Sequence, residues 1–322
     1  MAIPAYSRFW ILLAPLIPSI LVTIFVLYHL LKNRGYRTAL NNHVIILLLS
    51  VGLVEEITGI VWNIYFFRNG TSLLPTPAFC YAWIYIDTTA IVSVYILVTW
   101  ASIERHILIF HSGHFSTRTK RLLFHYLPMI LCILYPMIFY FVFFFIIPCN
   151  LPLRYTSRQC GRYSCVSLSP MVALYDSLAH YILPAFITVT FSGGLFVRVL
   201  YQKYHIHQRI DWRNYKKMAL QLLPISCLYI FLQLPPMSLY AAYSVGLPRT
   251  IGSDYFNDSL FFSFYIVLLT PFACAMSLPE LRTKCRNLTL FWRRIHAVDP
   301  MQTVTVARIK VGRMGGQATI NV

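Results

Sequence analysis

The sequence is poor in charged residues, and acidic residues are the scarcest among them. Only 11% of its 322 residues are Asp, Glu, Lys or Arg, with 10 acidic residues against 27 basic ones. A soluble domain usually carries about 25% charged residues. Here 58% of the residues are hydrophobic and the mean hydropathy is +0.62. These values exclude an ordinary soluble domain and predict a membrane protein.

The sequence also lacks the signatures of several enzyme classes. It has no His-Glu-x-x-His zinc pattern, no Gly-x-x-x-x-Gly-Lys phosphate loop and no Gly-x-Ser-x-Gly elbow. Its 10 histidines follow no spacing that is typical of metal ligands. We therefore predict neither enzymatic activity, nor a cofactor, nor a bound metal.

The hydrophobic residues are grouped into seven long runs. A helix needs about 20 apolar residues to cross a bilayer, and in lipid its backbone groups must pair within their own segment. The predicted fold is therefore all-α, with seven transmembrane helices in one domain over residues 1–298. The predicted spans are Phe9–Leu31, Ala39–Phe67, Ala78–Phe110, Leu122–Pro148, Pro170–Leu200, Met218–Val245 and Tyr255–Leu278.

Lysine and arginine predict the orientation of the chain. Most of them lie after the first, third and fifth runs and in the carboxyl-terminal segment, so we expect these parts in the cytoplasm and the amino terminus outside. The formal net charge of +17 then fits contact with anionic lipid, and no nucleic-acid partner is expected. Residues 279–294 predict a helix on the membrane surface, and residues 299–322 a disordered tail.

Several residues are candidates for covalent modification. Asn69 and Asn257 begin glycosylation sequons in predicted outer loops. Cys285 lies in a basic stretch just inside the membrane and is a candidate for palmitoylation. Four cysteines fall on the predicted outer side, where disulfides form, and they allow three pairings. They are Cys80, Cys149, Cys160 and Cys165.

Glu104 and Arg105 form an acid-base pair inside the third run, where ionisable side chains are costly and usually functional. With His106 they resemble the acid-Arg-aromatic triplet that ends the third helix of rhodopsin-like G-protein-coupled receptors, and Cys80 precedes Arg105 at the family's spacing. The prolines of the fifth, sixth and seventh runs also match that family. They are Pro184, Pro235 and Pro271.

This resemblance implies a function and a switch. A receptor of this kind lies in the plasma membrane, binds an extracellular ligand and activates a heterotrimeric G protein. Glu104 would hold Arg105 at rest, and Arg105 would contact the G protein when the sixth helix moves at Pro235. Gln233, Thr270 and Cys274 depart from the motifs that the family carries around Pro235 and Pro271.

The resemblance also implies disulfides and a ligand site. Cys80 would pair with Cys165, or alternatively with Cys160, and the preferred second bridge is Cys149 with Cys160. Asp87 matches the aspartate that holds the ammonium group in amine receptors, and it shares a helix face with Arg105. The other expected ligand-binding residues lie in the second, fifth and sixth runs. They are Glu56, Asp176, Ser177, His180, Gln233 and Tyr240.

Three alternatives remain open at the level of sequence. The ligand is a small amine-like molecule or a peptide, and the long segment from Cys149 to Ser169 favours the latter. Asp87 is otherwise satisfied by Tyr and His side chains within the bundle. A transporter or channel would instead use the carboxylates of the helices as a proton or cation path, but it would not account for Cys80 and the Glu104-Arg105 pair.

Overall fold

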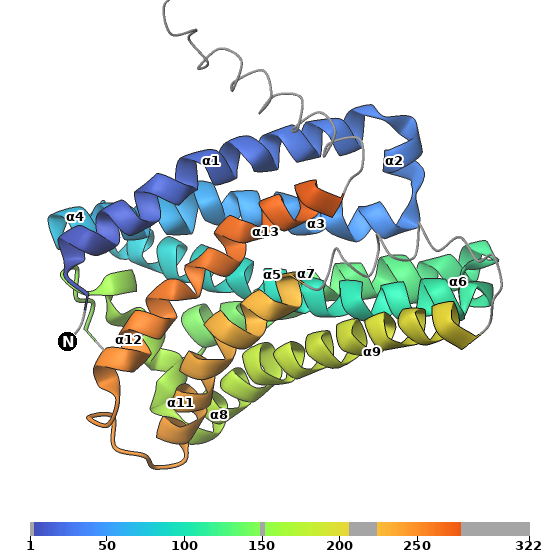
Figure 1. The fold of residues 1–322 in the computed structure, drawn as a ribbon. Helices are drawn as coiled ribbons and strands as arrows, with labels where there is room; N and C mark the ends of the chain where they lie inside the picture. The colour runs from blue at the N-terminus through green and yellow to red at the C-terminus, as the bar shows by residue number, and fades with distance from the viewer. Residues whose placement is uncertain (1–2, 149–151, 206–223, 278–322) are drawn as a thin grey trace, which may run out of the picture. The chain divides into compact units, whose positions relative to one another are not determined.

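The computed structural model describes residues 3–148, 152–205 and 224–277. Seven of its helical segments are long and apolar enough to cross a membrane, which confirms the predicted seven-helix architecture of a multi-pass membrane protein (Figure 1). The described residues belong to one compact unit within residues 1–279. The predicted surface helix, the tail, Cys149 and Cys285 lie outside the described residues.

The first three spans follow the predicted runs closely. The first is α1 (Ala5–Lys32), and a short α2 (Arg34–Thr38) connects it to the second span. The second span consists of α3 (Leu40–Glu55), a π-helical turn η1 (Glu56–Ile60) and α4 (Val61–Asn69). The third is α5 (Pro77–Phe110), which begins where the Thr76 hydroxyl accepts a hydrogen bond from the Phe79 amide.

The other four spans are also divided into shorter helical segments. A 3-10 turn η2 (Ser112–Phe115) precedes the fourth span. The fourth span consists of α6 (Arg118–Arg121), η3 (Leu122–Tyr126), α7 (Leu127–Phe141) and η4 (Val142–Ile146). The fifth consists of α8 (Pro170–Ser177), η6 (Leu178–Ile182) and α9 (Leu183–His205). The sixth contains η7 (Tyr229–Gln233) and α11 (Leu234–Ser244), and the seventh α12 (Ser253–Phe262) and α13 (Phe264–Ser277). In the sixth span, the described residues begin at Pro224.

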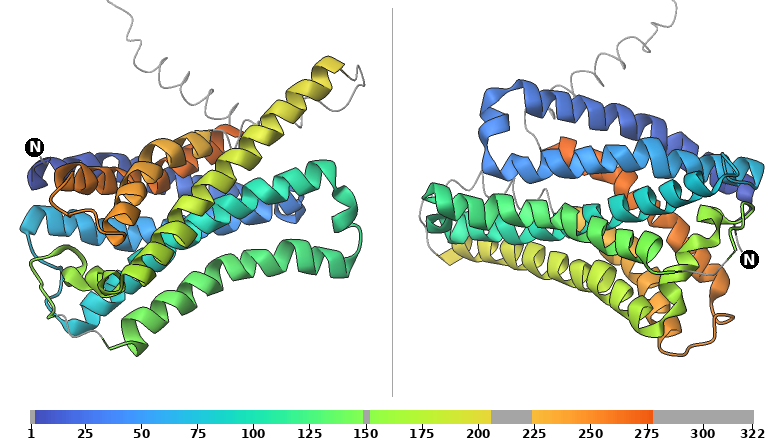
Figure 2. Two further views of the ribbon diagram at one scale, coloured as in Figure 1. Left: turned by 90° about the horizontal axis from the view of Figure 1, so that it is seen from below. Right: turned by 180° about the vertical axis from the view of Figure 1, so that it is seen from behind.

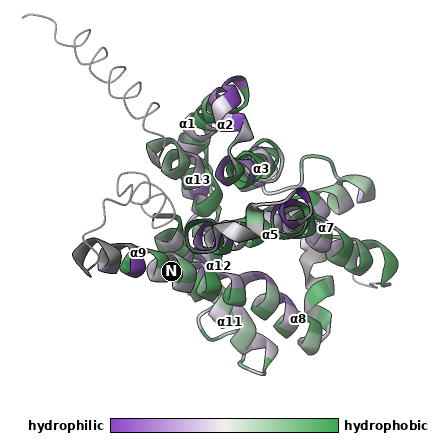
Figure 3. Cartoon of the chain, turned by 90° about the vertical axis from the view of Figure 1, so that its right-hand side faces the viewer, coloured by the Kyte–Doolittle hydropathy of each residue, from purple (hydrophilic) through white to green (hydrophobic). Residues whose placement is uncertain are grey.

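Helix α5 lies in the middle of the bundle. It packs against α3, α7 and α9, as the end-on view in Figure 3 and the two views in Figure 2 show. In its most apolar stretch 72% of the residues are buried, against 28% in α1, which presents large apolar side chains such as Ile17 and Leu21 outward. Because α5 is surrounded by protein, it can carry polar side chains that lipid would not tolerate.

One disulfide fixes the segment before α8 to the start of α5. Cys80 bonds to Cys160, with a Cα to Cα distance of 5.7 Å, and both are fully buried. The predicted Cys80–Cys165 and Cys149–Cys160 pairs are therefore wrong, and the alternative Cys80–Cys160 pair is confirmed. Cys165 is also disulfide-bonded. The end of the bundle that carries the Cys80–Cys160 bond is called the disulfide end below.

The turn that brings Cys160 to α5 has an unusual backbone. It belongs to η5 (Arg158–Leu168), in which Gln159, Cys160 and Gly161 have φ values of 50°, 53° and 70°. Residues other than glycine rarely adopt this left-handed region. Spacing along the sequence does not reveal such a turn, which is why the wrong cysteine was preferred.

Replacing either Cys80 or Cys160 by serine should lower the yield of monodisperse protein after detergent extraction, and the double variant should be no worse than either single one. The reason is that the bond closes a segment with a sequence separation of 80, and such a bond contributes about 2–5 kcal/mol. Cys227→Ser is the matched control, because Cys227 is exposed and free. A normal yield for Cys160→Ser together with a loss for Cys80→Ser would contradict this pairing.

Candidate functional site

A cavity of about 420 Å³ opens at the disulfide end of the bundle. Its volume lies within the range of small-molecule sites in proteins. Helix α5, the segment before α8, and helices α11 and α12 supply most of its wall. The lining residues on these elements include Asp87, Thr88, Ile91, Tyr95, Arg158, Gln159, Met237, Tyr240, Tyr243, Ser253, Phe256, Asn257 and Leu260.

Gln233 and Tyr95 form the polar part of the wall on the sixth and third spans. The Tyr95 hydroxyl donates a hydrogen bond of 2.8 Å to Oε1 of Gln233, and both side chains are 1% exposed. Nε2 of Gln233 has no hydrogen-bond acceptor in the described part of the chain. The Tyr95 ring packs edge-on against Tyr181, at 5.6 Å between centroids. The structure thus places Gln233 and Tyr240, both predicted ligand-binding residues, in the cavity wall.

Asp87 also reaches the cavity, but its carboxylate is already bound by the protein. It is 1% exposed, and Nδ2 of Asn63 donates to Oδ1 over 3.0 Å. Nε2 of Gln159, from the disulfide-bonded turn, donates to Oδ2. The sequence predicted that Asp87 lies at the cavity, but it did not predict Asn63 and Gln159 as its partners. Both are far from Asp87 in the sequence, so helical spacing does not reveal these contacts.

A second carboxyl group, that of Glu55, lies directly behind Asp87. A methyl group added at Gly59 would collide with both carboxylates, so the three residues meet at one point. Glu55 is fully buried, and neither of its oxygens accepts a hydrogen bond from a described donor. Arg158 is close enough to both carboxyl groups to interact with them electrostatically. Because glycine has no side chain, Gly59 gives the two acids the space they occupy.

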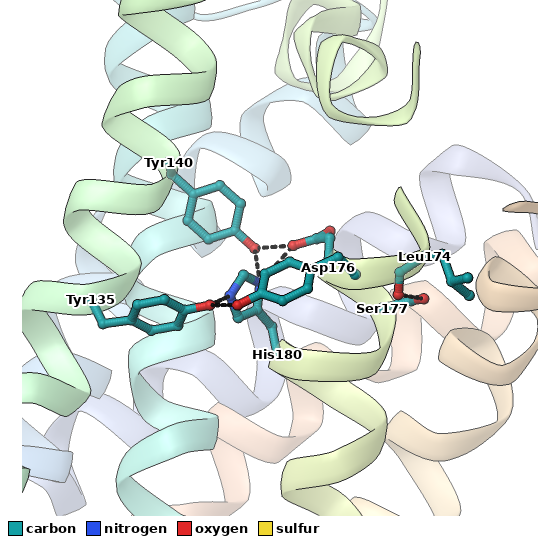
Figure 4. A network of polar contacts seen from close by, with 7 residues as sticks. Tyr135, Tyr140, Leu174, Asp176, Ser177 and His180 are labelled. Carbon is teal, nitrogen blue, oxygen red and sulfur yellow. Dashed lines mark hydrogen bonds and ion pairs between the residues drawn. The ribbon is translucent and has the colours of Figure 1, made fainter. Parts of the chain in front are cut away.

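Asp176 and His180 form a separate network toward α7 (Figure 4). Oδ1 of Asp176 accepts a hydrogen bond of 2.6 Å from the Tyr140 hydroxyl and lies 2.7 Å from Nδ1 of His180. Nε2 of His180 is 2.8 Å from the Tyr135 hydroxyl, while the Ser177 hydroxyl donates to the Leu174 carbonyl over 2.9 Å.

None of Asp176, Ser177 and His180 lines the cavity. The cavity thus gives no support to the prediction that these three side chains face a ligand, and it stays a prediction. The π-helical turn η6 changes the rotation of the fifth span at His180, so a regular helical spacing does not tell which way these residues point.

Glu56 was also expected near the ligand, and the structure places it elsewhere. It points to the first span, where the hydroxyls of Ser19 and Thr23 donate to its carboxylate, the latter over 3.2 Å. Glu56, Thr270 and Pro271 line a second cavity of about 10 Å³, which is near the size that holds one water molecule. The two neighbouring acids of the second span thus serve different regions of the bundle.

At the end of α5 opposite the disulfide, Glu104 contacts a histidine that sequence reasoning did not single out. Its Oε1 is bound by Nδ1 of His125, and both side chains are buried. Nε2 of His125 is 2.9 Å from the His43 ring, whose other nitrogen is 2.8 Å from the Arg37 carbonyl. The sequence could have indicated His125, because it is a histidine inside the apolar run of the fourth span.

Arg105 lies beside this cluster. It is 3% exposed and close enough to Glu104 and Cys274 to interact with them electrostatically. The neighbouring His106 packs its ring against Phe110 and Phe191, at 4.9 Å and 5.7 Å between centroids. The Glu104-Arg105 clasp remains a prediction, and the structure adds the Glu104–His125 contact to it.

The remaining candidates lie at element boundaries or on the surface. Pro235 stands in the first turn of α11, directly after the π-helical turn that holds Gln233, and Pro271 lies inside α13. Asn69 and Asn257 are both exposed, as glycosylation requires. Asn257 also lines the cavity, so a glycan there would stand at its rim.

Comparison with known proteins gives no relative from which a function could be transferred. No protein-family model matches the chain. No curated protein matches it significantly either.

Gly59→Ala should lower the thermal-unfolding midpoint of the purified protein, because its methyl group would collide with the carboxylates of Glu55 and Asp87. Gly52→Ala is the control on the same span, since its methyl group would meet the Val267 side chain at an ordinary 3.9 Å. Both substitutions gain roughly 1 kcal/mol in helix propensity, so the difference between their unfolding midpoints reports the collision at Gly59. Equal midpoints for the two variants would show that the carboxylates do not meet at Gly59.

Tyr140→Phe should lower the same midpoint, because it removes the hydroxyl that binds the buried Asp176 carboxylate. Hydrogen bonds between helices in membranes contribute about 1 kcal/mol, and His180 remains as the partner of Asp176, so we expect a loss of that order. Tyr126→Phe is the control, since Tyr126 is 39% exposed. A loss in Tyr126→Phe as large as in Tyr140→Phe would count against the network.

Proposed function

We propose that this chain is a receptor of the rhodopsin-like kind, which binds an extracellular ligand in the cavity and activates a heterotrimeric G protein. The observation that carries the proposal is the course of α5. This helix runs through the middle of the bundle, contributes Asp87 and Tyr95 to the cavity wall, and holds Arg105 near its other end. A ligand that shifts α5 or its neighbours would therefore also change the position of Arg105.

The proposed orientation puts the disulfide end outside the cell and Arg105 near the cytoplasm, in the plasma membrane. Two observations support it. A disulfide forms in an oxidising compartment, and the basic connectors follow the first, third and fifth spans. Membrane lipid is then the surrounding partner, and the basic residues face its anionic head groups.

The switch would act through the sixth span. Gln233 is the last residue of the π-helical turn η7, and Pro235 is the second residue of α11, which follows directly. Such a point bends more easily than a regular helix. A ligand that engages Gln233 would favour one of two arrangements of the sixth span, and the differential binding energy sets the size of the shift.

At the opposite end, the buried contact between Glu104 and His125 would belong to the resting arrangement. It fixes the fourth span to α5 beside Arg105. Breaking a buried pair is costly, so the resting state would be favoured until ligand binding compensates. Arg105 would then be presented to the G protein.

A transporter or channel remains the second candidate, because Glu55, Glu56 and Asp87 are buried acids within the spans. Their placement favours the receptor. Glu55 and Asp87 lie together behind the cavity, whereas Glu56 turns away to Ser19 and Thr23. The acids do not follow one another along a single route.

Arg105→Ala should reduce G-protein activation about tenfold or more without changing the amount of chain at the cell surface, since allosteric coupling is typically worth 1–3 kcal/mol. The measurement is energy transfer between G-protein subunits in cells that express the chain, at rest and during a compound screen. Arg198→Ala is the control, because Arg198 is an exposed arginine whose guanidinium lies over the Phe110 ring at 3.9 Å.

The same cells allow the two functions to be separated. Membrane current recorded alongside energy transfer gives the second readout. Unchanged activation in Arg105→Ala would count against the proposed switch. Current without any G-protein response would favour transport.

A further inference from the structure

The charged residues of the cavity wall are mostly basic. Arg158 and Arg249 line it, and Asp87 is its acidic member. Arg249 is exposed at the rim, in the connection between α11 and α12, and forms no ion pair with a described residue. A small molecule that enters the cavity therefore meets a positive charge first.

The acid that would attract a cation is occupied by the chain itself. Asn63 and Gln159 both donate to the Asp87 carboxylate. The Arg158 guanidinium interacts electrostatically with Asp87 and Glu55, and it lies 5.0 Å over the Phe264 ring. Together these groups supply what an ammonium ligand would bring: a positive charge, a hydrogen-bond donor and a contact with an aromatic face.

The charges of this group balance without a ligand. Glu55 and Asp87 are buried and meet at Gly59, and adjacent buried carboxyl groups cannot both stay ionised. With one of the two protonated, the pair carries a single negative charge, and Arg158 matches it. The group therefore has no excess negative charge for a cationic ligand to neutralise.

The turn that supplies these contacts is held in place. Cys160, which follows Gln159, is bonded to Cys80 on α5, and its carbonyl accepts a hydrogen bond of 3.0 Å from the Arg154 amide. An amine would have to displace Gln159 from a turn that is covalently attached to the bundle. This displacement would lower the affinity of the amine, whereas a ligand that binds elsewhere in the cavity leaves Gln159 in place.

What the cavity leaves unsatisfied is a donor. Nε2 of Gln233 is buried and has no acceptor in the described part of the chain, while Oε1 of the same side chain already accepts from Tyr95. A buried N–H group without a partner costs about 1–3 kcal/mol, which a ligand recovers when it brings an acceptor. Aromatic side chains, among them Tyr181 and Phe256, supply flat apolar surface for the body of such a ligand.

We propose that the cavity binds an anionic small molecule, a carboxylic acid with an aromatic body. An acceptor on its inner end receives the hydrogen bond of Gln233, and its carboxylate lies toward Arg249 at the rim. Since Arg158 is engaged by Asp87 and Glu55, Arg249 is the basic residue of the wall that is left for the carboxylate. This inference rests on the proposed function, since it names the ligand class of the same receptor, and it replaces the amine-like ligand that Asp87 alone suggests.

The test uses the purified full-length chain in lipid nanodiscs and three matched probe sets of equal size: aromatic carboxylic acids, their primary amides and the corresponding amines. The readout is the thermal-unfolding midpoint as a function of probe concentration. We expect the acids to raise the midpoint, the amides to need about tenfold higher concentration because the charge-assisted contact is lost, and the amines to have no effect.

Variants identify the groups responsible. Arg249→Gln should weaken the acids about tenfold, whereas Arg154→Gln should leave them unchanged, because Arg154 is an exposed arginine that does not line the cavity. Gln233→Leu should weaken acids and amides alike, since it removes the inner donor that both would use. The Arg249 variant keeps the test valid if Gln233→Leu folds poorly, because Arg249 is on the surface.

Two results would overturn the proposal. One is that no acid in the set raises the midpoint of the unaltered chain. The other is that the amines raise it and Asp87→Asn abolishes their effect. The same probes applied to cells separate this inference from the proposed function: acids that bind without G-protein activation would contradict the receptor but leave the ligand class standing. Activation by amines alone would support the receptor and contradict the proposed ligand class.

Discussion

The contact between Gln159 and Asp87 determines the chemistry of the disulfide end. It joins a turn outside the spans to the central helix, and the Cys80–Cys160 bond keeps that turn in place. Because of this contact, the acid that stands out in the sequence faces the protein rather than a ligand. The groups left for recognition are the amide of Gln233, the aromatic wall and the basic rim.

Four of the buried polar side chains occur at irregular points of the helices. Glu56, His125, His180 and Gln233 all lie within π-helical turns. A π-helical turn inserts an extra residue, so the side chains after it are rotated relative to those of a regular helix. In a bundle surrounded by lipid, each polar group must find a partner inside, and such turns give the chain freedom to aim one. The same turns provide points at which a span can bend.

The sequence predicted the spans well because the requirement behind them is simple. Any segment that crosses a hydrocarbon layer needs a long apolar run, and this requirement is independent of the neighbouring helices. Asp87, Gln233 and Tyr240 were also expected to bind a ligand, and all three line the cavity. The resemblance to rhodopsin-like receptors indicated their depth along each span, even though Gln233 departs from that family's motif.

The rest depends on contacts that spacing does not determine. The partner of Cys80 was wrong because the backbone reverses at Gln159 and Cys160 in a conformation that these residue types rarely adopt. Asp176 and His180 were expected near the ligand because of the resemblance to amine receptors, but Tyr140 on the fourth span contacts both of them. His125 was missed because Glu104 was paired with Arg105 by analogy. Each of these misses concerns which side chains meet between two segments that are distant in the sequence.

The placement of Arg158 and Gln159 has a consequence for how such a protein could diversify. These two residues belong to a connecting segment and reach the spans only through their side chains, Gln159 at Asp87 and Arg158 at Phe264. Replacing them with short neutral side chains would uncover Asp87 and Glu55 toward the cavity. If Arg249 changed as well, the proposed preference for an acid would turn toward a base, with every substitution lying in a connection between helices.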